Sequence, residues 1–469
     1  MRIVNVRRRS IAGAVLSLVA GVPLAPAWAD GAPLSLGQVL ERVRERNVTL
    51  RSAKASVVAS EGQVQKAWTA WQPNVQAAGQ LQFNTVEAKF DSSQIVVGVA
   101  QSLGPAFGLT PETVAGIVAN LQANAPEPTV IQPIVSVVGQ LSARQLLFNI
   151  NAVRAPGVAE KGRDAILGVV QATEDELTFA AAQLFVSING LRSLEAAAQR
   201  ASQVADRRIQ DAKAQLEAGT ATRLAVTRAE TDKANSEGQI LALRAQQTGL
   251  SAALKGLMGA TEEAVDVLNA PLDQQLKIEL PAAQEQRSKV RARELALAAA
   301  QASQTLSEHQ WLPTLNAEGV VRYANVQGFQ GTNVIGQATV NLMIPLYDQG
   351  VRYADQKIAA AQVESARLAL EAEKEAARTA LVEAESQLES ARAELAQAEA
   401  QLRFATEAVQ QIESLVQNGL GTNLELTDAD GRRFQADQAV AGKRLQVELA
   451  TVRLLYARGG RLGAALAAR

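Results

Sequence analysis

A heptad pattern of apolar residues predicts the most regular element of this chain. From Leu381 to Val416, large apolar residues recur at every seventh position. Alanine, or once isoleucine, follows three positions after each of the first five, from Ala384 to Ile412. Such a repeat is typical of helices that supercoil around neighbouring helices, and alanine in the seam lets the backbones approach closely. The pattern therefore predicts a long helix that packs against other helices.

This helix is the first arm of a predicted helical hairpin. No proline or glycine interrupts residues 351–417, which at about 1.5 Å per residue would span about 100 Å. The pattern breaks at residues 418–421, where either of two glycines can adopt the left-handed conformation that ends a helix. It resumes at Thr422 and continues to about Arg458, and these residues form the predicted second arm.

Four shorter stretches alternate apolar with polar residues, which predicts β-strands. Alternation places small apolar side chains on one face of each strand and glutamine, asparagine or charged side chains on the other. A polar face would be unfavourable inside a sheet that is buried on both sides, so we expect the polar face of these strands to meet water. The predicted strands are residues 75–83, 135–147, 315–323 and 334–346.

The order of predicted elements is repeated along the chain. A Trp-x-Pro sequence at residues 71–73 recurs at 311–313, and the Gly-x-x-x-x-Leu sequence at 219–224 recurs at 419–424. The offset is longer for the first pair because the loop between the first two strands carries extra residues. An internal repeat of this length is an architectural feature, and we assign the first repeat to residues 30–270 and the second to 271–469. The other predicted helices are residues 34–71 with a break near Asn47, 110–122, 152–216, 222–258 and 282–310.

The first 29 residues read as a secretory signal peptide. Arginines at position 2 and positions 7–9 precede an apolar stretch, and Ala27-Trp28-Ala29 forms a cleavage site, so the mature chain would begin at Asp30. No later run reaches the roughly 18 apolar residues of a membrane-spanning helix, so any membrane-embedded part would consist of β-strands.

Four strands with one apolar face are too few to enclose a water-filled pore, and lipid tolerates no open sheet edge. We therefore expect other copies of the chain to cover the edges. Three copies would give a 12-stranded barrel with a polar lumen, within the range of outer-membrane barrels. Trp71 and Trp311 stand just before strands, where they would either form an aromatic belt at the membrane interface or pack against helices.

Together these features resemble the TolC-type outer-membrane efflux protein family. The resemblance is carried by the export signal, the duplication, the Trp-x-Pro sequences, residues 346–350 (Leu-Tyr-Asp-Gln-Gly) at a strand-to-helix turn, and the two Gly-x-x-x-x-Leu tips. It covers about residues 34–458. It implies a mainly α fold with a membrane β-barrel contribution: a homotrimeric barrel in outer-membrane lipid, continued by a tunnel of twelve helices across the periplasm. In the first repeat, Asn-Ile-Asn at 149–151 replaces the family-like Asp-Gln-Gly at 348–350.

The resemblance also implies a function without enzymatic activity or cofactor. Such a chain would be the passive exit duct of a tripartite efflux or type I secretion system, and would dock a periplasmic adaptor and an inner-membrane pump. Drugs, metal ions, metabolites and polypeptides are all possible cargo. The alternative is a periplasmic coiled-coil adaptor that bridges membranes without a pore. An adaptor would carry one hairpin between compact β-domains, whereas this chain has two hairpins.

Two acidic residues follow the second tip. Glu425 and Asp428 are three positions apart and share a helix face. The resemblance implies that such residues line a narrow periplasmic entrance, where a ring of carboxylates would favour cations. They could instead only stabilise the start of a helix. The first repeat has Ala225 and Arg228 at these positions, and Arg228 could bridge to an acid on a neighbouring hairpin and hold the entrance closed.

The tips themselves are candidates for the adaptor-docking surface. Glycine and leucine are also needed there simply to cap and staple a hairpin, so both interpretations stay open. The candidate docking residues are Gly219, Thr220, Leu224, Gly419, Thr422 and Leu424.

The composition excludes several other functions. The chain has no cysteine and one histidine, His309, so disulfides and zinc sites are not expected, and we interpret His309 as solvated or interfacial. The 46 basic and 47 acidic residues are balanced, which does not favour nucleic-acid binding. No glycine-rich phosphate loop or nucleophile motif appears.

Overall fold

The computed structural model describes residues 33–124, 127–220, 222–260, 287–327 and 331–459. The predicted signal peptide and the predicted boundary between the repeats lie outside the described residues. The chain divides into two units. The tip unit comprises Met1–Val48, Asp175–Glu285 and Leu381–Arg469, and the sheet unit comprises Thr49–Glu174 and Gln286–Ala380, each as far as it is described.

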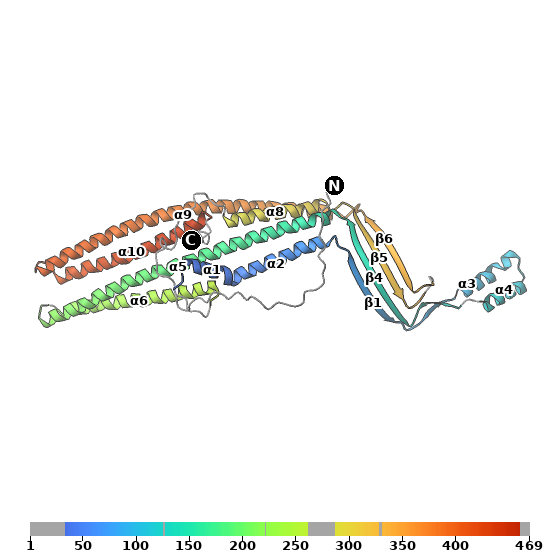
Figure 1. Cartoon of the computed structure of the whole chain (residues 1–469), viewed down its shortest axis with the longest axis horizontal. Helices are drawn as coiled ribbons and strands as arrows, with labels where there is room; N and C mark the ends of the chain where they lie inside the picture. The colour runs from blue at the N-terminus through green and yellow to red at the C-terminus, as the bar shows by residue number, and fades with distance from the viewer. Residues whose placement is uncertain (1–32, 125–126, 221, 261–286, 328–330, 460–469) are drawn as a thin grey trace, which may run out of the picture. The chain divides into compact units, whose positions relative to one another are not determined.

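The two repeats show the same order of elements, as predicted (Figure 1). The first repeat contains α1 (Leu36–Arg46), α2 (Val48–Thr69), β1 (Asn74–Phe83), β4 (Val135–Phe148), α5 (Ile150–Glu217) and α6 (Arg223–Met258). The second contains α8 (Ser288–Glu308), β5 (Thr314–Ala324), β6 (Val334–Met343), α9 (Val351–Gln417) and α10 (Asn423–Ala457). The last strand ends three residues before its predicted end, because Pro345 has no N–H to donate to a neighbouring strand.

The long loop of the first repeat is more ordered than the sequence suggested. It contains β2 (Ala88–Phe90), α3 (Ser92–Leu103), the 3₁₀-helix η1 (Pro105–Phe107), α4 (Pro111–Ala123) and β3 (Thr129–Gln132). The predicted helix at residues 110–122 is confirmed as α4, which starts at the cap residue Thr110 with proline in its first turn. Helix α3 and the β2–β3 pair were not predicted.

The four long strands of the sheet unit form one antiparallel sheet in the order β1-β4-β5-β6 (Figure 1). The register pairs Gly79 of β1 with Gly139 of β4, and Ala143 of β4 with Gly319 of β5. The apolar positions of neighbouring strands therefore lie opposite one another. This alignment gathers the apolar alternate residues on one face and the polar ones on the other. The outer strands β1 and β6 have no strand partner on their free edges within the described residues.

The apolar face of the sheet is exposed in a single chain. It carries valine, leucine, phenylalanine and tyrosine side chains from all four strands. A contiguous exposed apolar surface on a folded chain marks contact with a partner or with lipid. Its large exposed members are Val75, Leu81, Phe83, Val137, Leu141, Val321, Tyr323, Val334, Val340 and Leu342.

The core of the tip unit lies where α1 meets α5, α6 and α10. Leu36, Leu40 and Val43 of α1 pack with Phe185 of α5 in one buried cluster, to which α6 and α10 also contribute. The side chain of Asn47 donates a 2.8 Å hydrogen bond to the carbonyl of Leu257, which fixes the end of α1 on α6. This cluster anchors both helical hairpins.

The predicted heptad seam is confirmed in the tip unit. Ala384, Leu388 and Ala391 of α9 are buried against α10, where Ala450 and Leu454 belong to the same cluster. Large residues at one seam position and alanine at the other bring the two helices together, as the spacing predicted. In Figure 1, α9 and α10 run side by side to their tip, as α5 and α6 do to theirs. Across the described part of the chain, we find no helix that combines the length and the apolar character needed to cross a bilayer.

Candidate functional site

Both hairpin tips turn on a glycine in the left-handed conformation. Gly219 and Gly419 each have φ of 75°. After each turn the chain folds back onto its helix: the N–H of Thr220 donates to the carbonyl of Gln215, and the N–H of Leu420 donates to the carbonyl of Leu415, each at 2.8 Å. A residue with a Cβ atom is strained at this φ. The predicted tip turns are thus confirmed.

The two tips differ in how the returning helix begins. In the second tip, the Thr422 hydroxyl accepts a hydrogen bond from the Glu425 N–H at 3.2 Å, and the Glu425 carboxylate accepts one from the Thr422 N–H at 2.8 Å. These two bonds form a capping box. In the first tip, Thr222 makes no such bond, and Ala225 stands where the second tip has glutamate. Only the second tip therefore holds a carboxylate in a fixed position.

The capping box affects the charge of Glu425. The backbone N–H of Thr422, and then its hydroxyl, hold the pKa of the Glu425 carboxyl below its ordinary value of 4.5. The side chain is nevertheless exposed. Its negative charge is lost only as the pH falls through this lowered pKa.

The other two predicted charges lie nearby on exposed surface. Asp428 accepts a 2.9 Å hydrogen bond from Arg432 on its own helix, and both side chains are exposed. Such an exposed pair contributes little to stability. Arg228 is also exposed, and it takes part in none of the ion pairs found between described residues. Bridging by Arg228 to another chain stays a prediction.

The predicted docking residues are also accessible. Gly219, Thr220 and Gly419 lie at the turns, and Leu224 and Leu424 are exposed on the first turn of each returning helix. Leu420 at the second tip is exposed as well, although the sequence analysis did not single it out. Each tip therefore presents leucine to its surroundings rather than burying it in the hairpin.

A hollow of about 1030 Å³ lies between the two hairpins of the tip unit. Arginine is the most frequent residue type on its wall, and four aspartates also line it. The wall includes Arg228 and Asp428, together with charged residues that the sequence analysis did not select. Its charged residues are Arg200, Arg207, Arg208, Arg228, Asp232, Asp428, Asp430, Arg432, Arg433 and Asp437.

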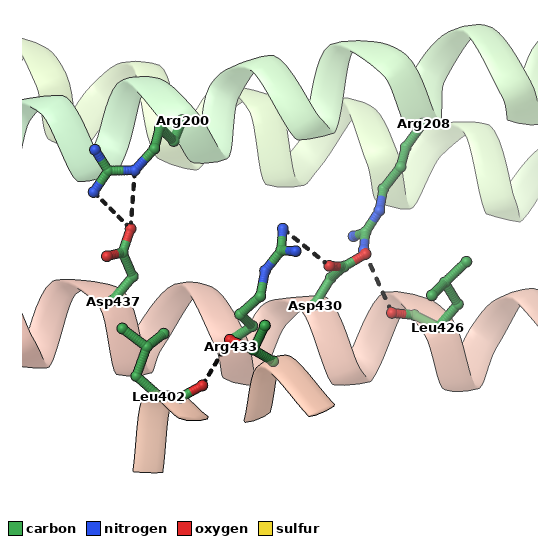
Figure 2. A network of polar contacts seen from close by, with 8 residues as sticks. Arg200, Arg208, Leu402, Leu426, Asp430, Arg433 and Asp437 are labelled. Carbon is green, nitrogen blue, oxygen red and sulfur yellow. Dashed lines mark hydrogen bonds and ion pairs between the residues drawn. The ribbon is translucent and has the colours of Figure 1, made fainter. Parts of the chain in front are cut away.

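Ion pairs across this hollow tie the two hairpins together (Figure 2). Arg208 of α5 reaches Asp430 of α10, which is only 8% exposed, and the same arginine group donates to the Leu426 carbonyl at 3.4 Å. Arg433 approaches the other oxygen of Asp430 at 3.3 Å. One buried carboxylate thus neutralises charge from both hairpins.

Two more contacts follow along the same pair of helices and their neighbours. Arg200 donates two hydrogen bonds to one oxygen of Asp437, at 2.8 and 3.1 Å (Figure 2). The amides of Gln239 and Gln438 donate to each other at 2.7 Å. The hairpins therefore contact one another through polar groups that lie between their tips and the core around Phe185.

His309 is not simply solvated. It is half-buried at the end of α8, where Nδ1 lies 2.8 Å from an Arg154 guanidinium nitrogen of α5. Nδ1 is also 2.8 Å from the carbonyl oxygen of Thr305. Within the part of the chain that the structure describes, no three histidine, aspartate or glutamate side chains gather as metal ligands do.

Comparison with known proteins agrees with this geometry. Residues 280–460 match the family model described as outer membrane efflux protein. The predicted resemblance to the TolC-type outer-membrane efflux family is confirmed. No curated protein sequence matches the chain. The family match covers the second repeat, which carries α9, α10 and the capped tip.

Solved structures extend the likeness to the fold of both repeats. The outer membrane protein VceC of Vibrio cholerae is 16% identical, with a TM-score of 0.69 over 91% of this chain and 96% of that one. The MtrE outer membrane channel of Neisseria gonorrhoeae, in its open state, is 18% identical, with a TM-score of 0.71 over 91% and 89%. CusC, described with transmembrane channel formation, is 16% identical, with a TM-score of 0.72 over 92% and 93%. These structures show that the fold of outer-membrane channels extends over both repeats, beyond the residues that the family model matches.

Proposed function

We propose that three copies of this chain form a passive exit duct through the outer membrane, as part of a tripartite efflux or type I secretion system. The observation that carries the proposal is the sheet of the sheet unit. Its apolar face is exposed, its other face is polar, and its edge strands β1 and β6 are free. Pairing β6 of one copy with β1 of the next would cover both edges and direct the apolar faces toward lipid.

Oligomeric state and conductance test this proposal directly. Protein extracted from outer membranes in mild detergent should run as a trimer, and planar bilayers that contain it should show discrete channel openings. A stable monomer without conductance would overturn the proposal and would favour the non-pore adaptor instead.

The tips are the proposed docking surface for a periplasmic adaptor, through which an inner-membrane pump would deliver cargo. Support comes from the exposed leucines that follow both turns, Leu224 and Leu424. An adaptor helix with an apolar face would bury them. Because glycine adopts a positive φ at both turns, substitution of the glycines would strain the hairpin itself, whereas the leucines can be changed without that complication.

Leu224→Glu combined with Leu424→Glu should abolish most efflux, because the new charges cannot be buried against an apolar partner. Trimer yield should not change, since both leucines are exposed. Efflux is measured as export of a fluorescent dye or another identified cargo from cells. Leu241→Glu is the matched control, because Leu241 is equally exposed on α6 but outside the tip. Equal efflux by the double variant and the control would contradict docking at the tips.

Glu425 and Asp428 are the proposed constriction residues. Three copies would place six carboxylates around the narrow end of the duct, which would attract multivalent cations. Glu425→Ala with Asp428→Ala should therefore raise single-channel conductance or remove block by a multivalent cation such as hexamminecobalt. Because the pKa of Glu425 is lowered, block of the unmodified protein should persist at mildly acidic pH and disappear only as the pH falls through that pKa.

The matched control for this double variant is Glu413→Ala, which removes an exposed carboxylate from α9 outside the proposed ring. It should leave both block and conductance unchanged. If the double variant in reconstituted trimers behaves like this control, the two acids only stabilise the start of α10.

A further inference from the structure

The loop between β1 and β4 contains a small helical hairpin whose role the proposed duct does not explain. We call residues 91–124, which span α3, η1 and α4, the insert. The second repeat has no counterpart, because a short loop joins β5 to β6. The insert connects the ends of β1 and β4 opposite to those that lead to α2 and α5. In a barrel, it would lie at the mouth remote from the helical tunnel.

The two helices of the insert contact each other through one face only. Val97 and Ala100 of α3 are half-buried, as are Val114 and Val118 of α4. At the junction, a Cβ atom on Gly104 would lie 2.6 Å from a methyl carbon of Val114, so glycine is required for this close approach. Even so, neither helix has a fully buried residue.

A second, adjacent face of α3 is also apolar, and it is exposed. Val96, Val99 and Leu103 are spaced three and four residues apart, and with Ile95 they are 47–56% exposed. The two glutamines of α3 lie on the side of the helix away from this exposed stripe. Phe107 in η1 adds an aromatic ring that is 78% exposed. The apolar sides of a helix are normally buried, and only one of the two apolar sides of α3 is covered.

Two glycines inside these helices have no explanation within the chain. Gly98 and Gly116 lie in the middle of α3 and α4, where glycine costs about 1 kcal/mol relative to alanine. A Cβ atom on either would meet nothing within 4 Å. Gly104, by contrast, is explained by its contact with Val114. Both glycines therefore lie on sides of the two helices that nothing in the chain covers.

The charge of the insert argues against a lipid surface as the covering partner. It contains no lysine or arginine, and its acids are Asp91 and Glu112. Helices that lie on membranes are rich in basic residues that contact anionic headgroups. Three such inserts could approach one another with little electrostatic repulsion. Each insert is also joined to β1, the free edge strand at which neighbouring copies would meet. A trimer would therefore hold the inserts together at about millimolar effective concentration.

We propose that the three inserts of a trimer pack together through the exposed face of α3 and cap the outer mouth of the duct. The occupant of this face is thus the insert of a second copy of the chain. This inference rests on the proposed trimer, and its test is designed so that the two can fail separately.

Because the chain has no cysteine, single cysteines can test this packing in the full-length protein. Val99→Cys and Leu103→Cys should form disulfide-linked or bismaleimide-linked dimers when the trimer is oxidised or treated with the reagent. Gln101→Cys is the matched control, since Gln101 is exposed on the other side of the same helix. Oxidation of Val99→Cys should also lower single-channel conductance, and a reducing agent should restore it.

Failure of the trimer and failure of the cap give different results. If the cysteine-free parent is not a trimer, the proposed function fails, and the cap fails with it. If the parent is a trimer but Val99→Cys and Leu103→Cys form no more cross-links than Gln101→Cys, the cap alone is overturned. In that case, a fluorophore at position 99 whose emission shifts to the blue only when lipid vesicles are added would assign the exposed face of α3 to lipid. If the links form but conductance does not change, the inserts pack without covering the mouth.

Discussion

Asp430→Ala should destabilise the tip unit by about 3–5 kcal/mol, the cost of leaving a buried charge without its partner. Asp430 accepts from Arg208 of the other hairpin and from Arg433 of its own helix, and it is almost fully buried. Removing its carboxylate leaves two arginines facing each other in the hollow. Repulsion between them should separate α5 from α10 near the tips.

Hydrogen exchange in the intact protein measures this effect. Amides of α5 around Arg208 and of α10 around Asp430 should lose protection, whereas the core around Phe185 should keep it. Asp437→Ala is the control, because the Arg200–Asp437 pair is more exposed and should contribute about 1 kcal/mol or less. Equal loss of protection in both variants would show that burial of Asp430 does not matter.

A second variant distinguishes the effect of an unpaired buried charge from the effect of lost packing at the same site. Arg208→Met with Asp430→Leu replaces both charges by apolar groups of similar size, which often restores or exceeds the original stability. Arg433 retains an exposed path to water, so it need not be left buried. If this double variant is as unstable as Asp430→Ala, the destabilisation comes from lost packing rather than from an unpaired charge.

The same pair shows what the sequence could not predict. Asp430 and Asp437 are seven residues apart and share a face of α10, and Arg200 and Arg208 lie eight residues apart on α5. Spacing gives the face of a helix on which a residue lies, but not which helix that face meets. The meeting of α5 and α10 depends on core contacts such as those of Phe185 and Leu36, which are distant in sequence.

Elements with a strict period were predictable. The seam of α9 follows from leucine and alanine at fixed spacing, and the four long strands follow from alternation, since each pattern has one physical solution. Helix α3 was missed because Ile95, Val96 and Val97 are β-branched and favour strands. Its start is fixed by Asp91, which accepts a hydrogen bond from the Ser93 N–H.

The candidate site was predictable only in part. The positions of both tips followed from glycine in a helical pattern. The capping box at residues 422–425 was not predicted, although Thr-x-x-Glu is the spacing that forms one. The buried ion pair was not foreseen, because burial of a charged residue depends on partners that no local pattern contains. The predicted acids turned out exposed, and the decisive buried acid lies two residues beyond Asp428.

Gly190→Val should destabilise the tip unit by about 3 kcal/mol, because it overpacks a close helix contact. Gly190 is buried in α5, and a Cβ atom there would lie 2.5–2.8 Å from three side-chain carbons of Leu445 in α10. Neither helix can retreat easily, since both belong to the core around Phe185. The change should appear as a lower midpoint when helical circular dichroism is followed in denaturant.

Leu445→Ala is the compensating change, because it removes three carbons from the contact, as many as valine adds at position 190. Alone it should cost about 2 kcal/mol through a cavity beside α5. Together, the two substitutions conserve volume and should cost about 1.5 kcal/mol or less, well below the sum of the single effects. Gly238→Val provides the control, because a Cβ atom on this helical glycine meets nothing within 4 Å and should be tolerated. If the double variant instead loses as much stability as the two single variants together, Leu445 is not the reason that position 190 needs a small residue. The contact between α5 and α10 would then not depend on this packing.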